Sequence, residues 1–425
     1  MEQANLKLLL VPAGYPRMAR PRLPLCGVLL VACVARERCD TAEVAAYAKQ
    51  FYSQGGLRQT WCPDDAWVEE FVRLARESPE RCGTAARPTA LVVGANKGYD
   101  CVGWAGLLSG RPELSKASWT EALAATLLRE HGIAWANLTK RQVRGVCGQA
   151  LVEYPRLPAS AAAGPFAYCV EPLPSNSRVI VSAADASPWR GALRMIAAAA
   201  TDAANGTLPF PRDAPFGAES IGFDDGNGSA SARLNHLKDG SAGAVGAGDV
   251  AVRAVSVDAL VREYLGGAAP AILTIDTEGS DALVLRGAAA TLASGGVGFL
   301  EFEFHEVGPW RDEQLEAVVD RLDSLSYDCY WAGQRRLFPI TGCWDARYAA
   351  RGWSNIACAH RGHACWADAM RAHVANASEV LPPVHVGPKQ RRRERRAGLE
   401  RSSAGPHPDA PRRRARVVSS QAEAR

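Results

Sequence analysis

Residues 271–304 read AILTIDTEGSDALVLRGAAATLASGGVGFLEFEF, and this stretch decides the expected fold. Two apolar runs, at 271–276 and 296–304, flank a segment whose apolar residues recur at helical spacing. Short apolar runs of this kind are typical of strands buried on both faces, which pair in parallel across a connecting helix. We therefore predict a strand–helix–strand unit with a right-handed crossover, the building block of a doubly wound α/β fold.

Further strands are expected on the N-terminal side of this unit. The apolar run at 90–93 enters the turn GANKG (94–98), which leads into a helix. The run FAYCVEP, which begins at Phe166, predicts a second strand, and a helix and a third strand follow within 177–200. The stretch 103–165 lies between the first two strands and is predicted to be an insertion.

The C-terminal side is expected to complete the sheet. Residues 205–249 are rich in Gly, Ser and Asp and are predicted to form a loop that acts as a lid. The runs YDCYWAG (327–333) and WSNIACAH (353–360) predict two closing strands, paired antiparallel at the edge of the sheet. The expected sheet is mostly parallel and seven-stranded, with its ligand at the carboxyl ends of the strands.

Both ends of the chain differ from this central domain, which we place at 88–365. Arg20 and Arg22 precede an apolar run of about 13 residues, a pattern typical of a signal peptide or anchor within 1–35. A buried element and an organelle transit peptide are the alternatives for this leader. Residues 40–87 are expected to form a helical extension, and 381–425 a basic disordered tail.

The net charge of +4 is unevenly distributed. Residues 389–425 hold twelve basic residues against four acidic ones, which leaves about −4 for the rest of the chain. Because the folded part has no basic excess, nucleic acid is not expected as a partner. The basic tail is a possible contact with a membrane surface.

The cysteines and the N-x-S/T sequons point to one compartment. Twelve cysteines are present, and removal of Cys26 and Cys33 with the leader would leave an even ten. The four late cysteines lack the paired C-x-x-C spacing of zinc sites, so we predict disulfide bridges and no metal site. Sequons at Asn137, Asn205, Asn227 and Asn376 agree with a glycoprotein of the secretory pathway; a plastid or another organelle is the alternative.

Polar motifs follow three of the predicted strands. The turn 94–98 offers backbone amides at a helix start, which can bind a carboxylate. Glu171 ends the second strand, where a carboxylate can accept hydrogen bonds from both hydroxyls of a ribose. Asp276 and Glu278 follow the fourth strand, on either side of a bend. Because carboxyl ends of parallel strands meet at one edge of the sheet, these motifs are expected to form one site.

Five segments in this order resemble the FkbM-like family of S-adenosylmethionine-dependent methyltransferases. They are VVGANKGYD, CVEP, ATDAANGTLPF, LTIDTEGSDALVLRGA and FLEFEFHEVGPW. The resemblance implies a class I, Rossmann-like methyltransferase fold, S-adenosyl-L-methionine as cofactor, and a hydroxyl on a small molecule or glycan as acceptor. One position departs from the family pattern, because Val92 stands where members usually carry an aspartate two residues before the first glycine.

The resemblance also implies roles for individual residues. Cofactor contacts are implied for Gly94, Ala95, Asn96 and Gly98 at the methionine part, Glu171 at the ribose, Asp202 near the adenine, and Asp276 near the transferred methyl group. A hydroxyl acceptor must also lose its proton to a base within about 2.6–3.2 Å. The candidates for this catalytic role are Asp276, Glu278, Glu303 and His305, although a histidine in such a place often serves only as a structural hydrogen-bonding group.

Two other functions fit part of the sequence. A binding protein of the lumen that has kept the fold and weakened its catalysis would explain Val92. A nicotinamide-dependent oxidoreductase would share the glycine turn, but the turn GANKG lacks the G-x-G-x-x-G spacing of dinucleotide-binding proteins. The sequence therefore favours a methyltransferase.

Overall fold

The computed structural model describes residues 39–84, 87–145, 147, 152–203, 205–218 and 248–376. The expected leader (1–35), the basic tail (381–425), Asn227 and most of the predicted lid loop lie outside these residues. Among the described helices, none combines the length and the apolar character needed to cross a membrane.

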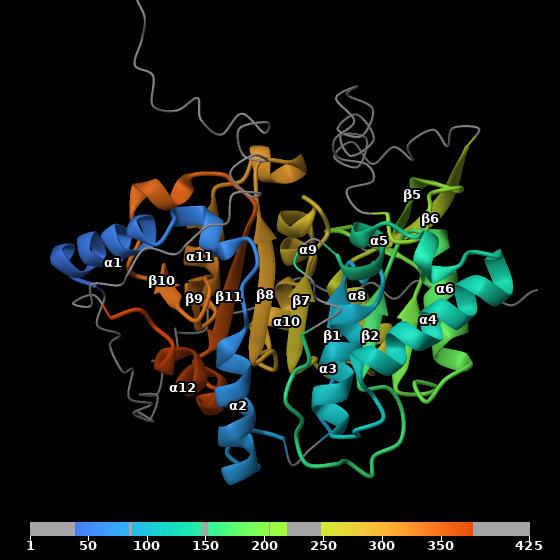
Figure 1. Ribbon diagram of the computed structural model, residues 1–425. Helices are drawn as coiled ribbons and strands as arrows, with labels where there is room; N and C mark the ends of the chain where they lie inside the picture. Colours follow the sequence, from blue (N-terminus) through green and yellow to red (C-terminus); the bar gives the residue numbers. More distant parts are fainter. Residues whose placement is uncertain are drawn as a thin grey trace, which may run out of the picture. The chain divides into compact units, whose positions relative to one another are not determined.

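A central eight-stranded sheet organises the domain (Figure 1), in the order β10-β9-β11-β8-β7-β1-β2-β3. Its strands are β1 (Ala90–Val93), β2 (Ala167–Val170), β3 (Leu193–Ile196), β7 (Ile272–Ile275), β8 (Phe299–Phe304), β9 (Tyr327–Ala332), β10 (Leu337–Pro339) and β11 (Ser354–His360). The strands from β3 to β8 pair in parallel, and the last three pair antiparallel. The order reverses between β1 and β7, which places the expected switch point there.

The central sheet has eight strands, one more than the seven that the sequence predicted. The short strand β10 pairs with β9 and forms the edge of the sheet, and β11 is inserted between β9 and β8. The two predicted closing strands do pair antiparallel, but neither of them is the edge. Three residues of β10 are too few to produce a clear alternation in the sequence, which explains why this strand was not predicted.

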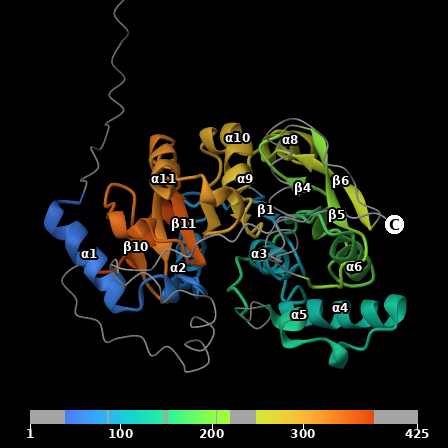
Figure 2. The same ribbon diagram turned by 90° about the horizontal axis from the view of Figure 1, so that it is seen from above.

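Helices cover both faces of the sheet (Figures 1 and 2). One face packs against α2 (Ala66–Glu77), α3 (Tyr99–Ser109), α4 (Lys116–His131), α6 (Pro174–Asp185) and α12 (Ala364–Ala372). The other packs against α1 (Thr41–Ser53), α8 (Val257–Tyr264), α9 (Asp281–Gly287), α10 (Ala289–Ala293) and α11 (Leu315–Ser324). Each strand therefore sends alternate side chains into two separate cores, as a doubly wound sheet requires.

The predicted loop 205–249 contains strand structure at both ends. A second sheet has the order β4-β6-β5, with β4 (Ala199–Ala200), β5 (Gly206–Pro211) and β6 (Asp249–Val255). The loop was predicted from the Gly, Ser and Asp content of the whole segment, and Pro209 and Pro211 weaken the strand pattern of β5 itself. Both prolines are tolerated because β5 is an edge strand, where a residue without an N–H can face away from the neighbouring strand.

The region between β1 and β2 adds helices to the fold. The crossover helix α3 runs to Ser109, and the additional elements after it are α4, η2 (Trp135–Asn137) and α5 (Lys140–Arg144). Helix α4 begins at a capping box formed by Ser115 and Ser118 and packs against α6. The insertion thus extends the helical layer beside the glycine turn.

The N-terminal extension consists of α1, η1 (Gly56–Thr60) and α2, and disulfides join it to the domain. The bonded pairs are Cys39–Cys343, Cys62–Cys147 and Cys82–Cys365. On α2, the ring of Phe71 stacks on Trp366 of α12 with centroids 3.7 Å apart. Covalent links and aromatic packing therefore hold the extension on the sheet.

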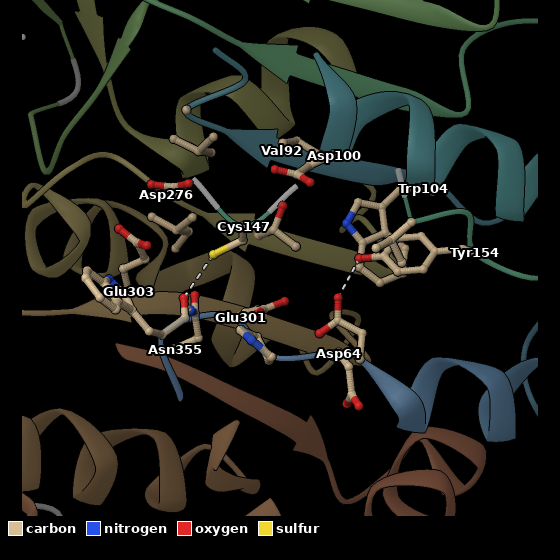
Figure 3. Close-up of a pocket in the computed structure, with 18 of the residues that line it drawn as sticks. Asp64, Val92, Asp100, Trp104, Cys147, Tyr154, Asp276, Glu301, Glu303 and Asn355 are labelled. Atoms are coloured by element: carbon tan, nitrogen blue, oxygen red, sulfur yellow. Dashed lines mark hydrogen bonds between the residues drawn. The ribbon is translucent and has the colours of Figure 1, made fainter. Parts of the chain in front are cut away.

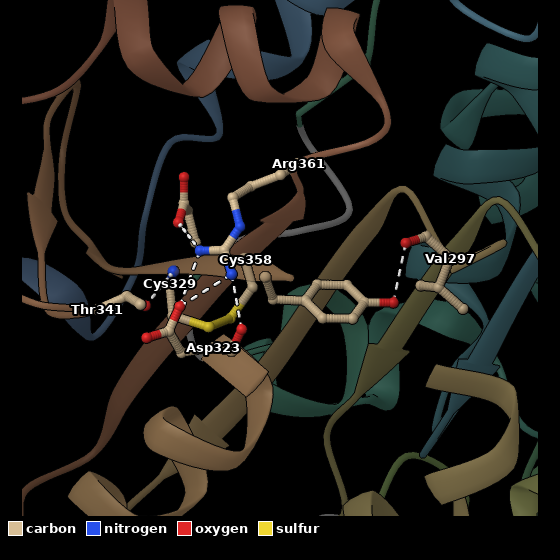
Figure 4. Close-up of a disulfide and its surroundings, with 8 residues drawn as sticks. Val297, Asp323, Cys329, Thr341, Cys358 and Arg361 are labelled. Carbon is tan, nitrogen blue, oxygen red and sulfur yellow. Dashed lines mark hydrogen bonds and ion pairs between the residues drawn. A yellow bond between two sulfur atoms is a disulfide. The ribbon is translucent and has the colours of Figure 1, made fainter. Parts of the chain in front are cut away.

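All ten described cysteines are paired, which confirms the prediction of disulfide bridges. The other two pairs are Cys101–Cys169, between α3 and β2, and Cys329–Cys358. Figure 4 shows that Cys329–Cys358 crosses between neighbouring positions of β9 and β11, beside the ion pairs of Arg361. Such a set of bridges is typical of proteins that fold in an oxidising compartment.

Candidate active site

The turn after β1 and the turn after β7 touch each other. The backbone N–H of Asp276 donates to the carbonyl of Val93 (2.8 Å), and the N–H groups of Gly94 and Ala95 both donate to Val170 on β2. Gly94 has a φ of 90°, and a Cβ built on it would lie 1.6 Å from the carbonyl oxygen of Asp276. Only glycine fits this contact, which brings the predicted motifs to one edge of the sheet.

Glu171 ties the glycine turn to the end of β2. Its Oε2 accepts the backbone N–H of Asn96 (2.7 Å), and its Oε1 accepts that of Leu173 (2.9 Å) and the side-chain amide of Asn176 (3.4 Å). The side chain is buried, and this burial raises the pKa of Glu171 to about 7, although the hydrogen bonds act in the opposite direction. Glu171 thus lies where the sequence predicted it and sets the shape of the turn.

A cavity of about 120 Å³ opens at the junction of β1, β7 and β8 (Figure 3). Strand ends and the extension share its wall: the acidic residues are Asp64, Asp65, Asp100, Asp276, Glu301 and Glu303, and the others include Trp61, Val92, Gly94, Trp104, Lys116, Cys147, Tyr154, Thr274 and Asn355. The cavity therefore brings together Gly94, Asp276 and Glu303 of the predicted site. Glu171 and Glu278 are not among the described residues that line it.

Asp276 and Glu303 form a carboxyl pair at this cavity. Their side chains hydrogen-bond to each other, and the pKa of both is raised well above the usual value by burial and by the neighbouring acids. Two carboxyl groups in direct contact share one proton, because both cannot be charged at this separation. The pair can therefore accept or hold one proton at the cavity wall.

Trp353 and His305 support Glu303. The indole N–H of Trp353 donates to Oε2 of Glu303 (3.2 Å), and the ring of Trp353 stacks on His305 with centroids 4.2 Å apart. Burial lowers the pKa of His305 to about 4, so this ring is neutral. Its Nδ1 accepts the N–H of Val307, which assigns the ring proton to Nε2, 4.0 Å from Glu303. His305 is not among the described residues that line the cavity.

Asp281 holds the turn after β7 in place, and the sequence did not single it out. It is fully buried and accepts the hydroxyl of Thr277 (3.0 Å) and the backbone N–H groups of Gly279 and Glu303, both at 3.3 Å. Within the same turn, Glu278 has a φ of 53°, a conformation that side chains rarely adopt. The carboxylate of Asp281 therefore fixes a strained turn against β8.

Asp202 lies apart from the cavity. It follows β4, and its half-exposed carboxylate pairs with the guanidinium of Arg286 on α9 (3.3 Å). Ala95 and Gly98 lie within the glycine turn, where a Cβ on Gly98 would lie 3.0 Å from the ring of Trp119. The turn is therefore packed against α4 as well as against β2.

Several residues of the cavity were not singled out from the sequence. Asp65 and Trp61 belong to the extension, Tyr154 follows the inserted helices, and Asp100 lies in the first turn of α3. Glu301 gave a signal in the sequence, because it alternates with Glu303 on an otherwise apolar strand. For Asp65 and Tyr154 only the tertiary contact reveals the role: the hydroxyl of Tyr154 donates to Oδ2 of Asp65 at 2.7 Å.

The reversal of strand order beside a glycine turn, with acidic residues at the ends of β7 and β8, agrees with the class I methyltransferase fold. Residues 159–329 match the sequence model of the Methyltransferase FkbM domain, which confirms for this region the resemblance read from its motifs. The match includes β2, β7 and β8 and leaves the turn 94–98 outside. Neither a curated protein nor a solved structure matches the chain.

The cavity suits a cationic group of modest size. Buried oxygens without a hydrogen-bond partner face it on Asp65 (Oδ1) and Thr274 (Oγ1), and carboxyl groups dominate its charge. S-adenosylmethionine carries a sulfonium and an ammonium, so the residues present fit this cofactor. Within the described ranges, no group of three or more His, Cys, Asp or Glu has the arrangement of a metal site.

Proposed function

We propose that this protein is an S-adenosylmethionine-dependent O-methyltransferase that acts on a hydroxyl of a glycan or small molecule. The observation that carries the proposal is the contact between the Gly94 turn and the Asp276–Glu303 pair at one cavity, within a chain that contains an FkbM domain. When bound, the cofactor supplies an activated methyl group, so the protein must chiefly position the acceptor and remove its proton.

The residues divide these tasks. The glycine turn brings the backbone close to the methionine part, although the N–H groups of Gly94, Ala95, Asn96 and Gly98 already have acceptors within the protein. Glu171 shapes this turn and is suited to the ribose after a rearrangement of its hydrogen bonds. Asp276, in its ionised form, accepts the proton of the acceptor hydroxyl. Glu303 keeps the shared proton of the pair, and the indole N–H of Trp353 fixes its orientation.

A substrate screen tests this function. The purified protein is incubated with S-adenosylmethionine and pools of hydroxylated small molecules and glycans, and mass spectrometry detects the gain of one methyl group. Asp276→Asn should lower turnover by about 100-fold or more while cofactor binding is retained, because a general base contributes 10²–10⁴-fold. Because the pKa of the pair is raised, turnover of the wild type should increase as pH rises above neutrality.

The competing function makes a different prediction. A binding protein that has lost catalysis would show no methyl transfer with any pool and no heat of binding at millimolar S-adenosylmethionine. That result would favour the binding protein over the enzyme. Val92 would then be the first position to examine as the cause of the lost activity.

We further propose that the protein works in the lumen of the secretory pathway or outside the cell, with a plastid or another organelle as the alternative. The five disulfides support an oxidising compartment, and Asn137, Asn205 and Asn376 are exposed sequon asparagines. A luminal enzyme would need imported cofactor, because S-adenosylmethionine is charged and does not cross a bilayer unaided. The basic tail remains a proposed contact with a membrane surface.

A further inference from the structure

We propose that Asp65 and Asp100 bind the ammonium group at the methionine end of S-adenosylmethionine. The assignment rests on the proposed function, since it requires this cofactor. It gives a task to two carboxylates to which the sequence motifs and the family resemblance assign no role. It also explains how the chain functions with a valine at position 92.

The first step of the argument is the chemistry of an α-amino acid. Its ammonium and carboxylate are attached to the same carbon, so the two groups cannot bind far apart. The family resemblance places the methionine part at the turn 94–98, and Gly94 of this turn lines the cavity, so the ammonium is expected in the cavity. Val92 forms the wall there with an apolar side chain that accepts no hydrogen bond, so the partner of the ammonium must come from another element.

Asp65 has the properties of such a partner. It occupies the N-cap of α2 with a φ of 52°, yet its side chain makes no capping hydrogen bond. Aspartate at an N-cap ordinarily accepts an N–H of its own helix, and a left-handed φ is costly for a residue with a side chain. Here Oδ2 accepts from Tyr154, and Oδ1 is buried without a hydrogen-bond partner. A buried oxygen of this kind is stabilised by an incoming N–H donor.

Asp100 lies on the adjoining wall. Figure 3 shows its carboxylate beside Val92 and directed into the cavity. It interacts electrostatically with Asp65, Asp276 and Glu301, so a cation between these side chains is favoured. An ammonium placed there gains two charge-assisted hydrogen bonds and relieves the repulsion between the acids.

One basic residue, Lys116, lines the cavity against six acidic ones. It interacts electrostatically with Asp100 and Asp65, and its ammonium lies over the ring of Tyr154 at 5.0 Å. The acidic residues therefore outnumber the one cation that competes for them. Burial raises the pKa of Asp65 to about 6, so at neutral pH most of its population is ionised and available to a cation.

Two ligands separate the ammonium contact from the rest of the site. S-adenosylhomocysteine has the ammonium and no sulfonium charge, whereas 5′-methylthioadenosine has the nucleoside and the sulfur without the amino acid group. We expect Asp65→Asn and Asp100→Asn each to weaken binding of S-adenosylhomocysteine by about 10- to 100-fold in calorimetry. Binding of 5′-methylthioadenosine should be unchanged in both variants. Glu69→Gln, an exposed change of the same charge on α2, is the matched control.

Each outcome decides the assignment. Wild-type affinity for S-adenosylhomocysteine in both variants would overturn it and leave the proposed methyltransferase intact. An equal loss of both ligands would also overturn it, because the variants would then act on the nucleoside site or on the fold. A wild-type protein that binds neither ligand would remove the proposed function and this inference together. If Asp65→Asn does not fold, Asp100→Asn decides alone.

Discussion

Gly94 shows how much a single position can constrain this site. Its missing side chain lets the turn after β1 rest on the backbone of Asp276, and its φ of 90° suits glycine best. Three of the five described non-glycine residues with positive φ, Asp65, Asn96 and Glu278, lie in the turns and the helix start around the same site. Strain concentrated in this way is typical of functional sites.

Gly94→Ala should therefore unfold or strongly destabilise the protein. The new methyl group would collide with backbone, which cannot move aside without separating β1 from β7, so a loss above about 4 kcal/mol is expected. Gly132→Ala is the control: it also has a positive φ (64°), but nothing lies within 4 Å of the added atom. That variant should lose only about 1–2 kcal/mol. Urea unfolding measures both, and equal losses would contradict the role of the close contact.

Glu171 should make stability depend on pH. Its pKa is raised from 4.5 to about 7 in the folded state, so the folded protein holds this proton more tightly than the unfolded chain. Stability from this group is therefore greatest below pH 4.5, falls as pH rises towards 7, and is constant above. In Glu171→Gln the decline between these values should be smaller. Urea midpoints measured across this range test the prediction, and an unchanged slope would reject it.

At the scale of elements, the disulfides fix the extension where it completes the cavity. Trp61 and Asp65 reach the cavity from the extension, and Asn355 on β11 holds the backbone of Thr60 and Trp61 through its side-chain amide. Cys62–Cys147 joins this part of the wall to the segment that precedes Tyr154. The sulfur of Cys147 itself contacts the carbonyl of Trp61 at 3.2 Å.

Removal of this bridge should affect ligand binding more than removal of a remote one. We expect the double variant Cys62→Ser, Cys147→Ser to lose affinity for S-adenosylhomocysteine, because both sides of the wall become free to separate. The double variant Cys329→Ser, Cys358→Ser should lose a comparable stability, about 2–5 kcal/mol, and keep its affinity. Calorimetry and urea unfolding of both variants compare the two effects. Equal affinities would show that the wall holds without the bridge.

The sequence predicts those elements whose pattern is local. The strand–helix–strand unit from β7 to β8 was expected because apolar runs and a helical repeat adjoin each other, and the glycine turn was expected from its composition. Strand β5 was not predicted because its two prolines weaken the strand pattern, and strand β10 was not predicted because it has only three residues. The roles of Asp65 and Asp100 were not predicted for a different reason. The two carboxylates come together only in the folded protein, and no local sequence pattern indicates this.

At the scale of the whole molecule, the bridges and the sequons make a joint prediction about the route of the chain. In a eukaryotic secretory host, the protein should carry N-linked glycans at the exposed asparagines 137 and 205. Treatment with a peptide N-glycosidase should shift its mobility, and Asn137→Gln with Asn205→Gln should reduce that shift. A reporter fused to residues 1–40 should enter the endoplasmic reticulum. A plastid or diffuse cytosolic reporter would refute this route.

The cavity wall is formed partly by the sheet and partly by the N-terminal extension, which has a consequence for how such a protein diversifies. The turns after β1 and β7 belong to the sheet, and Gly94 in the first of them tolerates no side chain. Trp61 and Asp65, in contrast, lie on the N-terminal extension, which disulfides anchor. New acceptor preferences could accordingly arise by altering the appendage alone. By the same reasoning, a truncated protein that lacks residues 39–84 would lack the part of the cavity wall that Trp61 and Asp65 form.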